Sequence, residues 1–184
     1  MTRSTAQRLA SLALALAVTL APLAAPAADA PVDGTWQAHD YEFTFSGFSS
    51  HYSCNGVATV LRDLLRSAGA RPGFRVTESC AAPGPEPIVV ARMRFETLSS
   101  GPPPAPPGQP LSRGQGVWRE VVLKGDGVRE VAGNCEVVQQ FAKEVLPLFE
   151  TRGVTSHMNC VPNDQILGNG IDLRFNVLAA APDH

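Results

Sequence analysis

The sequence predicts an α+β fold built from two tandem strand-helix-strand-strand repeats. The residues that recur are a tryptophan, two cysteines and an Arg-Phe-x-x-Leu tail, at Trp36, Cys54, Cys80 and Arg94 and again at Trp118, Cys135, Cys160 and Arg174. The two cysteine spacings are 26 and 25 residues, and the two tails begin 80 residues apart. Self-similarity at a fixed period indicates duplicated structural units.

The first repeat is expected over residues 28–98. Its opening strand, residues 34–48, alternates apolar and polar side chains, as a half-buried strand does. A helix capped by Ser53 or Asn55 follows, because apolar residues then recur at the 3, 4, 7 and 8 spacing of an amphipathic helix. Gly69 is expected to end that helix. The remaining two elements are strands, at residues 74–77 and 88–98.

A proline-rich connector, residues 99–115, is expected to separate the repeats. It holds six prolines, which favour an extended, exposed segment. The second repeat, residues 116–184, follows the same order. Its elements are predicted as a strand at 116–124, a helix over 135–149 with Asn134 as its cap, and strands at 154–160 and 171–178. Pro147 is expected to kink or end the helix.

The predicted architecture is a two-layer sandwich with both helices on one face of a mixed sheet. If the first two strands of a repeat are parallel, a right-handed crossover through the helix joins them. Each cysteine pair then lies at one end of its unit. We therefore expect one disulfide in each copy, Cys54–Cys80 and Cys135–Cys160, in an oxidising compartment.

The strand-helix-strand-strand order is similar in outline to half of a ferredoxin-like unit, and heavy-metal-associated domains share that outline. Those domains carry Cys-x-x-Cys before the helix. The matching loop here reads Cys54-Asn55-Gly56-Val57, with a single cysteine. The metal-loading chemistry of that family is therefore not implied for this chain.

The first 27 residues are typical of a secretory signal peptide. Arg3 and Arg8 precede an apolar run, and Ala25-Pro26-Ala27 supplies small residues for cleavage. We expect a protein exported to the periplasm or the extracellular space, with no membrane span after cleavage. A retained N-terminal anchor is the alternative. Of 15 basic residues, 13 remain after the two arginines are removed, against 17 acidic ones, which argues against nucleic-acid binding.

The candidate binding and metal residues are few. The aromatic-bearing loop before the first helix is the first candidate contact surface, with Phe48, Ser49, His51 and Tyr52. Arg94 and Arg174, equivalent in the two repeats, are a candidate anion clamp, although ion pairs with neighbouring strands explain them too. His51, His157 and Met158, each near a cysteine, are candidate zinc or copper ligands.

No strong catalytic motif occurs, so no catalytic residue and no cofactor are assigned. The leading functional prediction is a non-enzymatic binding or interaction module of the cell envelope. Its partner would be an envelope protein or a small ligand. A periplasmic metal-binding protein is the alternative. A hydrolase is the third, since Asp40 and Glu42 share one face of a strand.

Overall fold

The computed structural model of the protein describes residues 30–47, 52–79, 85–86, 88–101, 112–124, 134–160 and 170–181. Its elements, in chain order, are β1 (Val32–Ser46), β2 (Tyr52–Ser53), α1 (Cys54–Ser67), β3 (Arg75–Ser79), β4 (Pro85–Glu86), β5 (Ile88–Ser99), β6 (Arg113–Lys124), α3 (Cys135–Glu144), the 3₁₀ turn η1 (Leu146–Leu148), β7 (Thr151–Asn159) and β8 (Gly170–Ala180). The predicted signal segment, residues 1–27, and most of the proline-rich connector lie outside the described residues.

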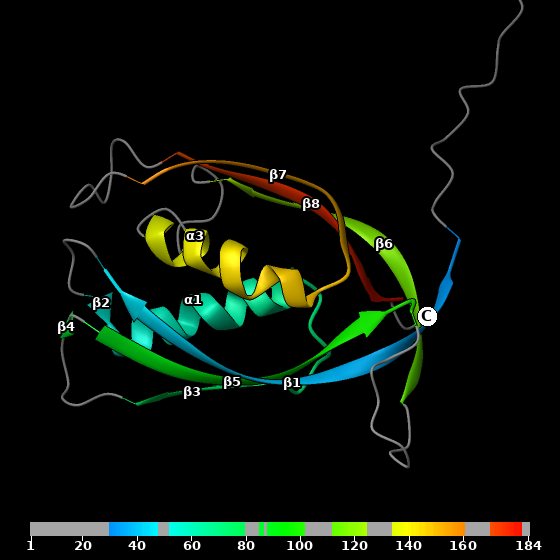
Figure 1. Cartoon of the computed structure of the whole chain (residues 1–184), viewed down its shortest axis with the longest axis horizontal. Coiled ribbons are helices and arrows are strands. Elements are labelled where there is room, and N and C mark those ends of the chain that lie inside the picture. Colours follow the sequence, from blue (N-terminus) through cyan, green and yellow to red (C-terminus); the bar gives the residue numbers. More distant parts are fainter. Residues whose placement is uncertain are drawn as a thin grey trace, which may run out of the picture.

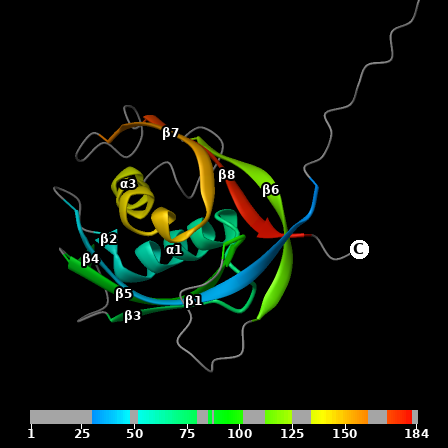
Figure 2. The same cartoon turned by 45° about the vertical axis from the view of Figure 1, so that its right-hand side comes forward.

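Six strands form one antiparallel sheet in the order β3-β5-β1-β6-β8-β7. The join between its two halves is narrow. β1 pairs with β6 only over Val32–Thr35, four register positions, whereas β1 pairs with β5 over twelve. The sheet curves at this seam, so that β3, β5 and β1 lie on one side of the helices and β6, β8 and β7 on the other (Figures 1 and 2).

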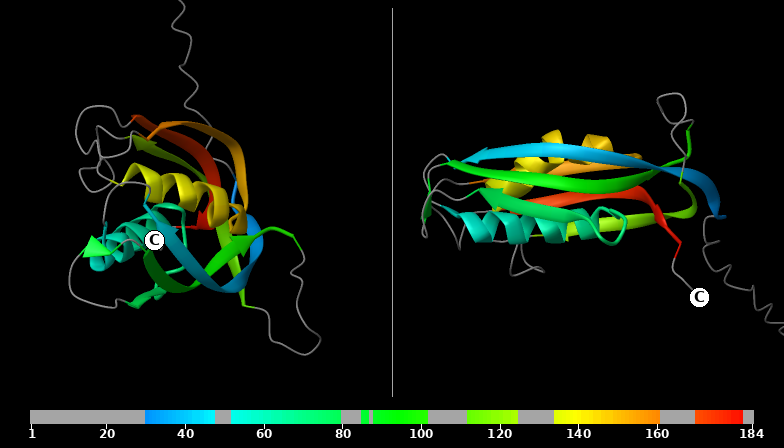
Figure 3. Two further views of the ribbon diagram at one scale, coloured as in Figure 1. Left: turned by 60° about the vertical axis from the view of Figure 1, so that its left-hand side comes forward. Right: turned by 90° about the horizontal axis from the view of Figure 1, so that it is seen from below.

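Both helices lie inside the curve of the sheet and supply the centre of the core (Figure 3). Their apolar stripes face the inner sides of both half-sheets. The largest fully buried side chains come from helices and strands alike: Leu61, Leu64, Leu65, Phe141, Phe43, Met93, Leu173 and Phe175. Each such side chain contributes about 1.5–3 kcal/mol of burial free energy. The helices therefore hold the two half-sheets together more than the narrow seam does.

The helix boundaries follow from local chemistry. The Ser53 hydroxyl accepts a hydrogen bond from the Gly56 amide at 3.1 Å, which confirms the predicted cap of α1. Gly69 follows the helix with φ of 84°, a conformation that glycine adopts at low cost. Asn134 precedes α3 but makes no side-chain capping bond. Pro147 falls within η1, and α3 ends at Glu144, five residues before the predicted end, because proline cannot continue the helix.

The predicted two-layer, ferredoxin-like sandwich of two helix-on-sheet repeats is wrong. The sheet is antiparallel throughout rather than mixed, and β5 lies between β1 and β3, so these two strands are not neighbours. The short connection between β3 and β5 suits the antiparallel pairing of these two strands, because such neighbours need only a few linking residues. The curved sheet also covers both helices from two sides rather than carrying them on one face.

Of the two predicted disulfides, the one in the second copy, Cys135–Cys160, is confirmed, with Cα atoms 5.4 Å apart. It is the one bridge that the described residues hold, so a disulfide in each copy is not shown. Cys80, the predicted partner of Cys54, lies outside the described residues, and no described cysteine is free. No helix in the described part of the chain has the length and apolar character needed to cross a membrane.

Candidate functional site

The candidate site is a cavity of about 540 Å³ beside the loop that joins α1 to β3. Three segments line it: 38–40 of β1, 71–74 of the loop and 94–96 of β5. A cavity of roughly 300–1,000 Å³ is the size that holds small organic ligands. The lining residues come from two adjacent strands of a packed sheet, so the walls on that side are rigid.

The cavity exists because the loop bows away from the edge of β5. The Arg71 amide donates to the Glu96 carbonyl at 2.9 Å, and β3 then begins pairing with Arg75 opposite Arg94. Between these two contact points the loop has more residues than β5 has, so the backbone of the loop bulges outward. Gly73 lies in this bulge with φ of 97°, and a Cβ at that position would meet nothing within 4 Å.

His39 and Phe95 form an aromatic part of the lining. Their rings stack with centroids 5.1 Å apart. The half-buried His39 ring bonds through Nε2 to the Thr97 hydroxyl at 2.8 Å, and that hydroxyl donates its single proton to the Leu148 carbonyl at 3.1 Å. His39 must therefore carry its own proton on Nε2. Burial lowers the pKa of His39 below its ordinary value, which keeps the ring neutral near pH 7.

Two ion pairs form the polar walls. Arg94 donates from Nε to Asp40 at 3.0 Å. Arg71 donates from Nη1 to Glu96 at 2.8 Å, and its guanidinium lies over the Trp36 ring, 5.1 Å from the centroid. The stacked, bonded Arg71 is a fixed wall of the cavity. Arg94, whose side chain is 76% exposed, bonds to a single side chain of the described residues, that of Asp40.

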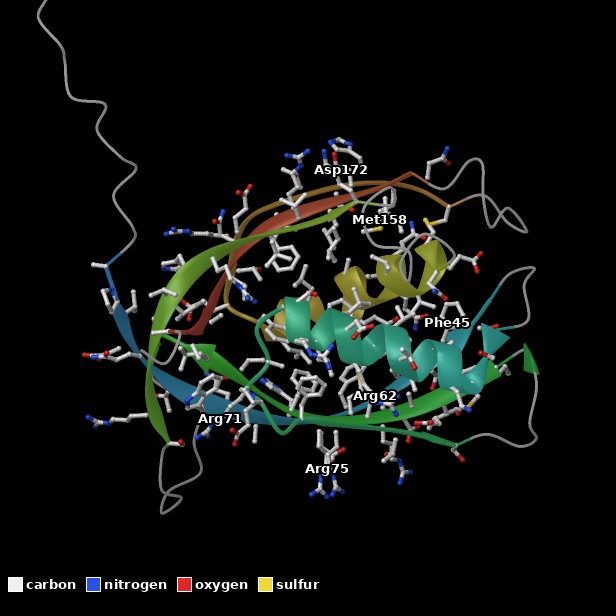
Figure 4. The ribbon with its side chains drawn as sticks, turned by 180° about the vertical axis from the view of Figure 1, so that it is seen from behind. Phe45, Arg62, Arg71, Arg75, Met158 and Asp172 are labelled. Atoms are coloured by element: carbon white, nitrogen blue, oxygen red, sulfur yellow. A yellow bond between two sulfur atoms is a disulfide. The ribbon has the colours of Figure 1, made fainter. Side chains whose placement is uncertain are left out.

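Arg75 stands next to Arg94 on the outer face of the sheet. The two residues are directly opposite each other in the β3–β5 register, and Arg75 projects away from the sheet in Figure 4. Two guanidinium groups therefore share one face at the edge of the cavity. Like charges directly opposite on neighbouring strands are unfavourable.

The structure does not bring the predicted anion clamp together. Arg94 lies on β5 and Arg174 on β8, in opposite halves of the sheet. Arg174 instead donates two hydrogen bonds to Asp172 on its own strand, at 2.8 and 3.3 Å. These bonds from Arg174 lower the pKa of the Asp172 carboxyl below its ordinary value. Figure 4 shows Asp172 and Arg75 on opposite sides of the molecule.

The predicted metal ligands are also not assembled among the described residues. His157 is exposed on β7 opposite Asp172, whereas the adjacent Met158 turns toward the core. No group of three or more histidine, cysteine, aspartate or glutamate side chains in the described part of the chain could hold a metal ion. His51 lies outside that part.

The predicted contact loop falls mostly outside the described residues, which exclude Phe48, Ser49 and His51. Tyr52 belongs to β2, and only its backbone is described. The carboxylates considered for a hydrolase, Asp40 and Glu42, each pair with an arginine of β5.

A second polar cluster joins β1 to α3 on the inner face. The Tyr41 hydroxyl donates to Glu144 at 3.2 Å, and Gln140 donates to the same carboxylate at 3.1 Å. Burial, and then the charge of Glu144, raise the pKa of Tyr41. Because these side chains hydrogen-bond to one another, the cluster links β1 to α3 and stabilises their packing.

Sequence reasoning missed the cavity and three of its residues, Arg71, Phe74 and His39. The available signal was the Pro72-Gly73 dipeptide between a helix and a strand, which marks a turn. A turn alone does not reveal that the chain bows away from a strand edge, because that depends on pairing between distant segments.

Comparisons with protein-family profiles, with curated proteins and with solved structures found no match for this chain. Its function has to be argued from the site itself.

Proposed function

We propose that the protein is an exported, non-enzymatic binding module that holds a small ligand in the cavity between β1, β5 and the 71–74 loop. The observation that carries the proposal is the cavity itself, about 540 Å³ in volume and walled by ion pairs on a rigid sheet. Binding sites of this kind combine apolar lining with a few placed polar groups.

The bonding of the polar groups favours binding over catalysis. Acid–base catalysis needs a side chain positioned to take or give a proton. In this cavity the Asp40 and Glu96 carboxylates each accept from an arginine, and His39 donates its ring proton to Thr97 from Nε2 in a hydrogen bond. Carboxylates paired in this way orient a ligand rather than take up its protons.

Export is part of the proposal and draws on two features. The disulfide Cys135–Cys160 is compatible with an oxidising compartment. The signal-like composition of residues 1–27 points the same way.

The test is a fragment screen by amide chemical shifts on ¹⁵N-labelled protein. Ala38 is exposed on β1 and lines the cavity, so Ala38→Phe should fill the site and abolish fragment-induced shifts at residues 71–74 and 94–96. Thr44→Phe, exposed on the same face of the same strand but outside the lining, is the matched control and should leave binding intact. Fragments that bind Ala38→Phe as well as the parent would refute the proposal.

A further inference from the structure

Resting on the proposed binding function, we propose that the ligand is a small organic carboxylate. Arg94 and Arg75 bind its charged group, and its apolar body lies in the cavity against Ala38, Pro72 and Phe74.

Unused hydrogen-bond donors point to an acceptor. A guanidinium carries five N–H donors, and Arg94 uses only its Nε within the described part of the chain. Both terminal nitrogens of Arg94 are thus available. Arg75 makes no ion pair with any described residue. A carboxylate matches such a fork with two parallel bonds.

The charge balance of the site points to an anion. The lining holds two arginines, Arg71 and Arg94, and two carboxylates, Asp40 and Glu96, which balance. Arg75, outside the lining but directly opposite Arg94, adds one positive charge beside them. A carboxylate between Arg75 and Arg94 would replace a repulsion with two attractions, whereas a cation would add a third like charge.

The remainder of the lining favours an apolar body over a bare anion. Ala38, Pro72 and Phe74 contribute aliphatic and aromatic surface, and His39 stacks on Phe95 as a neutral ring. An inorganic ion would leave this surface in contact with water, while an aromatic or aliphatic group would cover it. The cavity volume of about 540 Å³ has room for both parts of the ligand.

The experiment compares a charged probe with a neutral probe of the same shape. Binding of 2-naphthoate and of 2-naphthamide is titrated by chemical shift on the full chain, at low salt. Arg94→Gln and Arg75→Gln are the test variants. Arg92→Gln is the matched control, because Arg92 lies on the same strand, bonds Glu42 through Nε at 3.1 Å as Arg94 bonds Asp40, and is 72% exposed, yet lies outside the lining.

We expect naphthoate to bind the parent protein more tightly than naphthamide. Arg94→Gln should weaken naphthoate binding by about tenfold, the size of a hydrogen bond to a charged group at an exposed site. Arg75→Gln should weaken it by a smaller factor. Arg92→Gln should leave it unchanged, and no variant should affect naphthamide.

Three results would overturn the inference. Equal binding of naphthamide and naphthoate, both blocked by Ala38→Phe, would keep the cavity as the site but reject the anion. If Arg92→Gln weakened naphthoate binding as much as Arg94→Gln does, the attraction would come from the overall positive charge and not from the Arg94–Arg75 pair. Acetate or inorganic phosphate binding as tightly as naphthoate would reject the apolar body. The proposed binding function would fail in a different way: the binding of every probe would be unchanged in Ala38→Phe.

Discussion

Thr97 shows how one residue couples the site to the core. The residue is 2% exposed, and its hydroxyl joins His39 of β1 to the carbonyl of Leu148 beyond α3. A buried hydroxyl with both roles satisfied holds three elements in one arrangement. The position of the His39 ring in the cavity therefore depends on a residue behind it.

Thr97→Val should destabilise the protein by about 1–3 kcal/mol, because valine has the same shape but leaves the Leu148 carbonyl and the His39 N–H without a partner. Urea denaturation followed by circular dichroism measures the change. Thr77→Val is the control, since Thr77 is exposed on β3. A loss no larger than that of Thr77→Val would show that the buried network contributes little.

His39 makes a prediction about pH. Burial lowers its pKa in the folded protein below the ordinary value of 6.5, so the unfolded chain takes up the proton more readily. The stability that the neutral ring contributes should be present above that ordinary pKa and lost as the pH falls through the lower folded-state pKa. The free energy of unfolding of His39→Gln, measured between about pH 5 and 8, should fall less steeply on acidification than that of the parent. Parallel curves would contradict the assignment.

At the residue scale, the sequence could identify side chains but not their partners. Arg94 pairs with Asp40 of the neighbouring strand β1, as the ion-pair alternative predicted. The sequence could not predict that Asp40 and Arg75 flank Arg94, because both neighbours are set by strand register. A repeat argument paired Arg94 with Arg174 instead, and the curvature of the sheet separates them.

At the scale of elements, Cys135–Cys160 ties the start of α3 to the end of β7. Replacing both cysteines with alanine should lower the free energy of unfolding by about 3 kcal/mol, from the loop entropy returned to the unfolded chain, given a sequence separation of 25. Chemical denaturation of the double variant measures it, with the parent under the same non-reducing conditions for comparison. A double variant as stable as the parent would contradict the estimate.

Element positions were the part of the fold that local patterns could predict. The alternating segment became β1 and the amphipathic stripe became α1, each within a few residues of the expected bounds. The proline at 147 correctly limited the second helix. These features depend on neighbours in sequence, for which periodicity is a direct signal.

At the scale of the whole molecule, the order of strands was beyond the sequence. Alternation shows that a strand has one buried face, but it is the same whether the neighbour is parallel or antiparallel. The short connection from β3 to β5 favours their antiparallel pairing, but the pairing of β5 with β1 on its other side joins segments far apart in the chain. To predict the curvature by which one sheet covers two helices, the position of the seam must be known. At the seam, only four residues of β1 pair with β6.

Gly116 marks that seam and tests its packing. A Cβ there would lie 2.5 Å from Leu98 Cδ2, 2.9 Å from Leu178 Cδ1 and 3.1 Å from the Ala179 carbonyl oxygen. Gly116→Ala should therefore destabilise the protein by about 1–3 kcal/mol through overpacking. Thermal unfolding measures it.

The matched control for the seam is Gly170→Ala. Gly170 is also in a strand, and a Cβ on that residue would have no neighbouring atom within 4 Å. That variant should unfold at nearly the parental temperature. If the two substitutions have equal effects, close packing at the seam is not what requires glycine at 116.

The seam also brings the start of the first strand close to the end of the last. Val32 is opposite Gly116, and Gly116 is opposite Ala180, so the start of β1 and the end of β8 lie in one row of the sheet (Figure 1). Two strand spacings of about 4.8 Å separate them. A short glycine-serine linker could join Ala180 to Val32, with new ends opened at Arg113 and Ser99.

Such a circular permutant should fold to the same sheet, with an amide spectrum that matches the parent away from the new ends. A spectrum without dispersed amide signals would contradict this. The two half-sheets would then be synthesised in reverse order, and the mutual fit of their inner faces around the helices would specify the fold without regard to which half leaves the ribosome first.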